Sequence, residues 1–117
     1  GIRVPLSGPS ARRVENRLAG MDCNPYLGIA ASLACGYLGL TEQRQPSAEF
    51  KGDAYAADED IPQVMGEALD LFDSAESLHE VLGEDFARVY SIVKRAEYDE
   101  FLQVISPWER EHLLLNV

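Results

Sequence analysis

Two segments carry most of the information in this 117-residue sequence: Ala11-Arg12-Arg13-Val14-Glu15-Asn16-Arg17-Leu18-Ala19-Gly20 and Asn24-Pro25-Tyr26-Leu27-Gly28-Ile29-Ala30-Ala31. In a strand, side chains two residues apart share a face, so Arg13, Glu15 and Arg17 would point the same way. We therefore predict a strand over residues 12–18 with one charged face. Asn24 is suited to cap a helix and Pro25 to open it, which predicts a helix from Pro25 to about Gly39.

The residues around these segments indicate an α+β fold that is mostly α. Residues 2–6 form a β-branched run that ends in a Ser-Gly-Pro-Ser turn, which predicts a first short strand. The helix from Pro25 is expected to be buried, because apolar and small residues recur along it without charge. Residues 41–60 show no periodicity and are predicted to form a loop, in which Tyr55 is an ordinary loop residue.

Further helices are predicted downstream, which gives two short strands followed by four or five helices. One opens at Asp60-Ile61-Pro62, and a short one runs from a Ser74 cap to Leu82, with Gly83 suited to follow its end. The longest spans residues 84–104, and the last begins at Ser106-Pro107-Trp108-Glu109, which has the form of a capping box. The inner stripe of the longest helix is expected to consist of Phe86, Val89, Tyr90, Val93, Ala96 or Glu97, and Phe101.

Composition excludes some classes of function. The chain has 10 Lys and Arg against 20 Asp and Glu, a formal net charge of −10, which argues against binding to nucleic acid or to anionic lipid. The longest apolar stretch, residues 27–40, is too short to span a bilayer. Two cysteines are too few for a disulfide scaffold, and no segment has the form of a targeting signal. We therefore expect a cytoplasmic protein that binds neither nucleic acid nor membrane.

Several common sites lack their required spacing. Cys23 and Cys35 are distant in sequence from His79 and His112, which argues against a zinc site, and both histidines are predicted to lie on the surface. The Ser-Gly-Pro-Ser turn at residues 7–10 is not followed by the Lys-Ser/Thr of a P-loop. No Ser–His–acid set can be assembled from spacing.

One charged constellation remains, formed by Arg3 and the segment from Arg12 to Arg17. Two interpretations stay open on spacing alone. The first is a solvent-exposed charge ladder on two strands, which adds little beyond modest stability. The second is a polyanion site, in which a carboxylate holds a divalent metal while neighbouring guanidinium groups bind phosphate and carboxylate oxygens.

The two quoted segments together resemble the C-terminal region of the glutamine synthetase family. Arg3 in Ile2-Arg3-Val4-Pro5 is similar to that family's preceding arginine-containing strand, and the resemblance continues through Gly52-Asp53-Ala54-Tyr55, Ile61-Pro62, Glu67-Ala68-Leu69 and Trp108-Glu109-Arg110. It covers nearly the whole chain. The Gly-x-Asp-x-Asn-Pro-Tyr-Leu motif at residues 20–27 resembles most the branch of the family that includes γ-glutamylpolyamine synthetases.

The resemblance implies a chemistry and a set of roles. In that family ATP phosphorylates the γ-carboxylate of glutamate, and an amine then displaces phosphate. ATP and Mg2+ or Mn2+ are thus the implied cofactors, and L-glutamate with ammonia or a polyamine the implied substrates. Glu15 falls on the family's metal-ligand glutamate, Arg17 on the arginine that holds substrate glutamate, and Arg3 on an arginine that contacts the ATP phosphates. No residue of this chain falls on a catalytic position.

The sequence also departs from the family pattern. The turn between Pro5 and Arg12 is one residue shorter than in typical bacterial members, and Ser10 stands where many have a basic residue near the nucleotide. We expect residues 1–117 to be the C-terminal part of a catalytic domain whose N-terminal part lies outside this chain. The complete protein is expected to form a homo-oligomeric ring, and the chain alone is expected to be inactive. The alternative is a non-catalytic helical interaction module derived from the family, whose apolar helix at residues 25–40 would need a cover.

Overall fold

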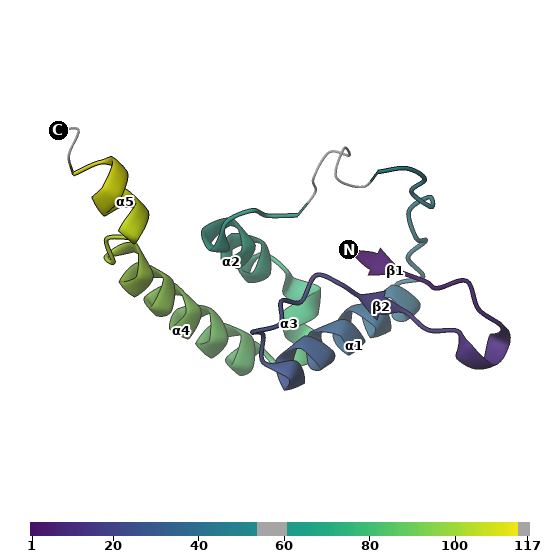
Figure 1. Ribbon diagram of the computed structural model, residues 1–117. Coiled ribbons are helices and arrows are strands. Elements are labelled where there is room, and N and C mark those ends of the chain that lie inside the picture. Colours follow the sequence, from purple (N-terminus) through teal and green to yellow (C-terminus); the bar gives the residue numbers. More distant parts are fainter. Residues whose placement is uncertain (54–60, 115–117) are drawn as a thin grey trace. The chain divides into compact units, whose positions relative to one another are not determined.

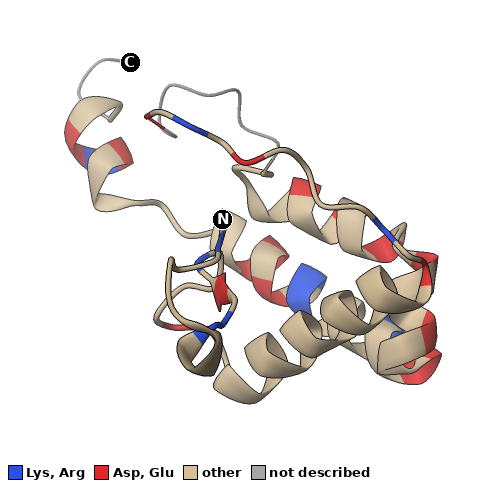
Figure 2. Cartoon of the chain, turned by 90° about the vertical axis from the view of Figure 1, so that its right-hand side faces the viewer, with Lys and Arg blue, Asp and Glu red and all other residues tan. Residues whose placement is uncertain are grey.

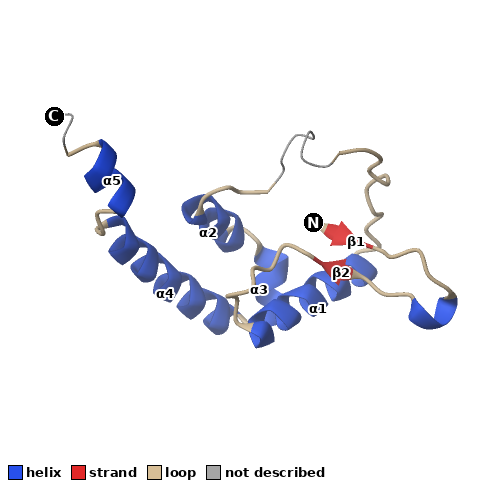
Figure 3. Ribbon diagram, in the orientation of Figure 1, coloured by secondary structure: helices blue, strands red, loops and turns tan. Residues whose placement is uncertain are grey.

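The computed structural model describes residues 1–53 and 61–114, which form two short strands and a series of helices (Figures 1 and 3). The chain divides into two compact units, Gly1–Ser47 and Ala48–Val117. The predicted fold class, α+β and mostly α, is confirmed. Parts of the predicted loop at 41–60, including Tyr55 and Asp60, lie outside the described residues, as does Leu115.

The two strands of the first unit form a small antiparallel sheet. β1 (Ile2–Arg3) pairs with β2 (Glu15–Asn16), so that Ile2 lies opposite Asn16 and Arg3 opposite Glu15. A short 3-10 turn, η1 (Pro9–Ala11), lies between them. Both strands are shorter than the predicted spans of 2–6 and 12–18. Pro5 cannot donate a ladder hydrogen bond, and the turn that follows carries the chain away from the pairing.

Helix α1 (Pro25–Thr41) begins as the sequence predicts and ends slightly later. The Asn24 side chain accepts hydrogen bonds from the backbone N–H groups of Tyr26 and Leu27, and Pro25 occupies the first turn. These contacts satisfy N–H groups that have no partner within the helix. The helix passes through Gly39 because a helical glycine costs only about 1 kcal/mol relative to alanine, which neighbouring residues can offset.

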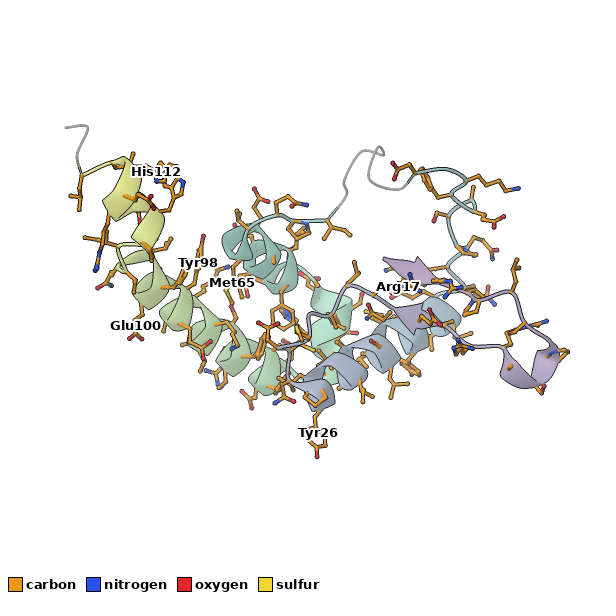
Figure 4. All side chains as sticks on the ribbon, viewed as in Figure 1. Arg17, Tyr26, Met65, Tyr98, Glu100 and His112 are labelled. Atoms are coloured by element: carbon orange, nitrogen blue, oxygen red, sulfur yellow. The ribbon has the colours of Figure 1, made fainter. Side chains whose placement is uncertain are left out.

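The prediction that α1 is buried is wrong for this chain. Of its residues, all of which are described, Ala34 alone is buried. Figure 4 shows Tyr26 pointing away from the helix, and its exposed fraction is 83%. Large apolar residues are exposed at helical spacing along α1: Tyr26, Ile29, Leu33, Tyr37 and Leu40. A helix that is apolar on all sides requires cover on all sides, and the first unit supplies only part of it.

The second unit contains four helices within its described residues: α2 (Met65–Asp73), α3 (Glu76–Leu82), α4 (Glu84–Leu102) and α5 (Pro107–His112). α2 begins at Met65, after Val64, rather than at Pro62 as predicted. Ser74 does not cap α3 as predicted, because its hydroxyl donates to the carbonyl of Leu71 at the end of α2. Gly83 separates α3 from α4 with φ +95°, a conformation that favours glycine.

The predicted capping box of the last helix is confirmed. The Ser106 hydroxyl accepts from the Glu109 N–H at 3.1 Å, and the Glu109 carboxylate accepts from the Ser106 N–H at 2.6 Å. These hydrogen bonds hold the pKa of Glu109 below its usual range. Among the helices of the described residues, none has the length and apolar character needed to cross a membrane.

The core of the second unit lies where α2 and α3 pack against α4. Leu69, Ala87 and Ser91 are buried there. The Phe72 ring contacts the rings of His79 and Tyr90, with centroids 5.0 and 5.6 Å apart. His79 is half-buried rather than on the surface, and its Nε2 forms a hydrogen bond with the Phe72 carbonyl.

The predicted inner stripe of α4 is partly wrong. Tyr90 alone of the predicted stripe is half-buried, and Ala87 and Ser91 occupy the buried face instead. The other predicted positions are exposed: Phe86, Val89, Val93, Ala96, Glu97 and Phe101. Small side chains at these two positions allow α2 and α3 to approach α4 closely, and this outweighs the preference for burying larger apolar groups. Tyr98 lies on the same side, and Figure 4 shows it near Met65 of α2.

An ion-pair cluster joins α2 to α4 beside this core. Arg95 Nη2 lies 2.8 Å from Asp70 Oδ1, and Arg95 Nε lies 3.1 Å from Asp73 Oδ2. A hydrogen bond with Ser91 and then the contact with Arg95 lower the pKa of Asp73, against a partial desolvation that raises it. The folded state therefore prefers the ionised form of Asp73.

The cap of α1 predicts a loss of stability when it is removed. Asn24→Ala is expected to lower the free energy of unfolding by about 1 kcal/mol, because two backbone N–H groups lose their acceptor. Asn24→Asp is the matched control, since its carboxylate can accept the same hydrogen bonds. Urea unfolding followed by far-UV circular dichroism measures both variants. Equal stability of Asn24→Ala and the parent would contradict the role of the cap.

The Asp73 cluster predicts a pH dependence of stability. Because the folded-state pKa of Asp73 is lowered, its contribution is complete above the ordinary aspartate pKa of about 3.9. The contribution is lost as pH falls through the lower folded-state pKa. Asp73→Asn is expected to reduce the change in stability between about pH 5 and pH 2. Asp99→Asn, on α4 outside this cluster, is the control, and an unchanged slope in Asp73→Asn would refute the prediction.

Candidate functional site

The strand pairing places an arginine and a glutamate on the same side of the small sheet. Arg3 in β1 lies directly opposite Glu15 in β2. Directly opposite residues on antiparallel strands project from the same face, so their side chains can meet. Arg3 Nη1 donates to Glu15 Oε2 at 3.1 Å. A residue at the start of the chain is thus joined to the charged segment twelve positions later.

Two more arginines reach the same carboxylate from the β2 segment itself. Arg17 Nη2 donates to Glu15 Oε2 at 3.1 Å. Arg13 contacts the other oxygen, with Nη2 2.8 Å and Nε 3.1 Å from Oε1. Arg13, Glu15 and Arg17 therefore share one face, as their alternation predicts. Figure 2 shows basic and acidic positions together on the strand segment, and Figure 4 labels Arg17 there.

We call Arg3, Arg13, Glu15 and Arg17 the Glu15 cluster. It contains three positive groups and one negative group, a net charge of +2 in a chain whose net charge is −10. Partial desolvation raises the pKa of Glu15, but hydrogen bonds from Arg17, Arg3 and Arg13 together hold that pKa below its usual value. Glu15 is consequently ionised at neutral pH, and both of its oxygens are occupied by guanidinium groups.

The side chains of the Glu15 cluster are partly exposed to solvent. The Glu15 side chain is 23% exposed, whereas the arginine side chains are 52–59% exposed. Ion pairs at such exposure contribute little net stability because water competes for both partners. A ligand with stronger charge complementarity could therefore replace them at small cost.

The opposite face of β2 contacts α1. The Asn16 side-chain amide donates to the Ser32 hydroxyl at 2.9 Å, and that hydroxyl donates to the Gly28 carbonyl at 2.8 Å. Asn16 Oδ1 also accepts from the Leu18 N–H. These hydrogen bonds hold β2 on the helix, so Glu15 and its neighbours face away from α1. The alternation of side chains along the strand predicts that Asn16 and Glu15 lie on different faces of β2. No sequence signal identifies Ser32 as the hydrogen-bond partner of Asn16.

A shallow groove lies between the β2 segment and α1. Its volume is about 340 Å³, and it is lined mainly by apolar and small residues, among them Val14, Cys23, Ile29 and Leu33. Asn16 and Ser32 supply its polar wall. The groove contains no member of the Glu15 cluster, so it is separate from the charged face.

The Glu15 carboxylate has the right chemistry to be one ligand of a divalent metal. Mg2+ prefers oxygen ligands and commonly uses one or two carboxylates together with substrate phosphates. Within residues 1–53 and 61–114, no group of three or more His, Cys, Asp or Glu side chains is placed to hold a metal. Glu15 can thus supply one ligand of a metal site whose other ligands lie outside the described residues. The arginines of the cluster are suited to bind the anions that would accompany the metal.

Arg13 is the member of the Glu15 cluster to which sequence reasoning gave no role. The alternation places Arg13 on the charged face because it stands two residues before Glu15, but it does not predict that Arg13 contacts Oε1. Ser10, the position at which the sequence departs from the family pattern, lies in η1 and is exposed. The turn itself contains no basic residue, and the arginines that contact Glu15 are Arg3, Arg13 and Arg17.

Comparison with known proteins gives a consistent match across the chain. Residues 1–113 match the family model described as glutamine synthetase, catalytic domain. A glutamine synthetase of Halobacterium salinarum is 32% identical over 97% of this chain and 27% of its own length. A glutamate–isopropylamine ligase of a Pseudomonas species is 32% identical over 92% of the chain and 24% of its own length. A γ-glutamylethanolamide synthetase of Streptomyces coelicolor is 33% identical over 92% and 23%.

The chain spans about a quarter of the length of the curated relatives it matches. The matched region includes both strands, the Glu15 cluster and all helices of the described residues. The extent of this match, and the presence of the charged strand segment within it, lead to one conclusion. The chain belongs to the glutamine synthetase family and corresponds to part of its catalytic domain.

Proposed function

We propose that residues 1–117 are the C-terminal part of the catalytic domain of an ATP-dependent glutamate–amine ligase that acts through a γ-glutamyl phosphate. Membership of the glutamine synthetase family supports the ligase class. The observation that carries the proposal is the convergence of three guanidinium groups on the Glu15 carboxylate. Such a cluster suits a reaction whose substrates are polyanions.

Three members of the cluster take the roles that the resemblance to the glutamine synthetase family implies. Glu15 supplies one oxygen ligand to a Mg2+ or Mn2+ ion, Arg3 binds phosphate oxygens of ATP, and Arg17 binds the carboxylate of L-glutamate. The metal, when bound, neutralises charge that develops on the phosphates. The arginines orient anionic groups with their planar forks, which match phosphate and carboxylate geometry. We assign no acid or base role to the chain.

The amine acceptor remains open within this proposal. Relatives of similar identity are named glutamine synthetase, glutamate–isopropylamine ligase and γ-glutamylethanolamide synthetase. Because relatives named for different amines match the same segment, we expect the shared region to serve glutamate activation and acceptor choice to depend on residues elsewhere. Ammonia and a polyamine both stay candidates, and a ring-forming oligomer in the cytoplasm stays a prediction.

Replacement of the cluster's charged groups is expected to separate their roles. In the protein that contains this chain, Glu15→Gln is expected to lower kcat/KM by about 100-fold or more, because charge stabilisation during phosphoryl transfer is lost. Arg17→Gln is expected to raise KM for glutamate about 10- to 100-fold, since a hydrogen bond to a charged group contributes about 1.5–3 kcal/mol. Steady-state kinetics with ATP, glutamate and ammonia measure both.

Arg12→Gln is the matched control for these variants. Arg12 lies in the same segment but is not among the ion-pair partners of Glu15 in the described residues. It is expected to retain near-parental kinetics. If Arg12→Gln and Glu15→Gln were equally impaired, the effect would reflect general charge loss, and the assigned roles would be wrong.

The chain alone is expected to lack ligase activity. One carboxylate and three arginines cannot position ATP, glutamate and an amine together, and positioning provides much of the rate enhancement in such reactions. Purified residues 1–117, incubated with ATP, Mg2+, glutamate and ammonia or putrescine, are expected to yield no γ-glutamyl amide by mass spectrometry. Product formation that depends on Glu15 would overturn this expectation.

A second candidate function is supported by the exposed side of α1. Tyr26, Ile29, Leu33, Tyr37 and Leu40 form an uncharged stripe that needs cover. In the interaction-module interpretation this stripe binds another chain, and the Glu15 cluster has no reaction. The two candidates respond differently to substitution: Glu15→Ala abolishes activity in a ligase but leaves association intact, whereas Leu33→Glu disrupts association in a module.

A further inference from the structure

The Glu15 carboxylate is fully engaged by its arginine neighbours. Oε2 accepts from Arg3 and Arg17, each at 3.1 Å, and Oε1 accepts from Arg13 Nε at 3.1 Å, with Arg13 Nη2 2.8 Å away in an ion pair. A carboxylate offers about four lone-pair positions, and here three hydrogen bonds and the close ion-pair contact of Arg13 Nη2 surround them. A metal ion needs one of these lone pairs. Glu15 can therefore serve as a metal ligand only if it gives up at least one guanidinium contact.

The arginines are placed to take a new partner when they are released. Each is more than half exposed, so the side that does not face Glu15 is open to solvent. Without Glu15 the three guanidinium groups would carry a charge of +3 in a small region. Such a region attracts anions with two or more negative charges, and the planar forks match tetrahedral oxyanions.

We propose that Glu15 couples the binding of a divalent cation to the binding of an oxyanion by exchanging partners. This inference rests on the proposed function and concerns the regulation of the same site. In the cation-free state, Glu15 holds Arg3, Arg13 and Arg17 together and reduces their attraction for anions. When Glu15 turns its carboxylate to a cation, the arginines are released to the anion. Each ligand therefore strengthens the binding of the other.

Coupling of this kind is reciprocal, which makes it measurable from either ligand. A factor by which the anion improves cation affinity must equal the factor by which the cation improves anion affinity. A static site, in which Glu15 binds the cation and the arginines bind the anion without first contacting each other, would also show coupling, because the bound cation and anion attract each other. The distinguishing feature of partner exchange is the behaviour of single variants in the absence of the second ligand.

Removing one competing guanidinium is expected to improve cation binding by itself. Arg13→Gln removes the hydrogen bond and the ion pair to Oε1, so Glu15 is freer to bind a cation. Glu15→Gln is expected to improve anion binding by itself, because the arginines are no longer held by a carboxylate. A purely preorganising Glu15 would give the opposite result in the second variant, since anion affinity would fall when the arginines separate.

The test uses Mn2+ and inorganic sulfate as probes, with isothermal titration calorimetry at fixed free-ion concentrations and constant ionic strength. The relevant Mn2+ site is the one lost in Glu15→Gln. In the parent protein, sulfate is expected to tighten this site at least about fivefold, the lower end of typical coupling. In Arg13→Gln, Mn2+ alone is expected to bind about twofold or more tightly, and the sulfate effect is expected to shrink. Arg12→Gln should keep the parental coupling.

The outcomes separate the failure of this inference from failure of the proposed function. If Mn2+ binds at a Glu15-dependent site but sulfate leaves its affinity unchanged or weakens it, partner exchange is wrong and the metal role survives. If Glu15→Gln binds sulfate more weakly than the parent, partner exchange is also wrong. If no Mn2+ site depends on Glu15, the assigned metal role fails and the coupling fails with it. Circular dichroism of each variant confirms that the fold is retained.

Discussion

The pairing of Arg3 with Glu15 across the two strands is the contact on which the charged site depends. Each strand contains only two residues, and the register of this pair decides which side chains share a face. A shift by one residue would turn Glu15 toward α1 and Asn16 toward the arginines. The salt bridge and the hydrogen bond from the Arg17 N–H to the Gly1 carbonyl both favour the observed register.

The two faces of β2 serve different purposes because of this register. Asn16 binds Ser32 on α1 and thereby fixes the strand to the longest element of the first unit. Glu15, on the other face, is left to the arginines. Short strands are weakly stable alone, so an attachment to a helix is needed to hold the charged face in place. The uncharged character of α1 allows this attachment without competing ion pairs.

Local signals in the sequence predicted the start of α1, the capping box at Ser106 and the alternation around Glu15. Each depends on residues within a few positions, where geometry is set by the backbone. Strand length, the inner face of α4 and the burial of α1 depend on contacts between distant residues. Val89 and Val93 look like core positions by apolar character, yet the small residues Ala87 and Ser91 allow closer packing and occupy the buried face.

The residues of the candidate site could be predicted from the sequence, but the contacts between their side chains could not. Arg3, Glu15 and Arg17 were identified by resemblance, whereas the double contact of Arg13 with Oε1 required coordinates. That contact changes the physical description of Glu15. A carboxylate with free lone pairs can bind a metal directly, but the carboxylate of Glu15 is ion-paired with three guanidinium groups. Glu15 can be both a metal ligand and the ion-pair partner of the arginines only if it exchanges one partner for the other. The arginines are more than half exposed, so breaking one of these ion pairs costs little free energy.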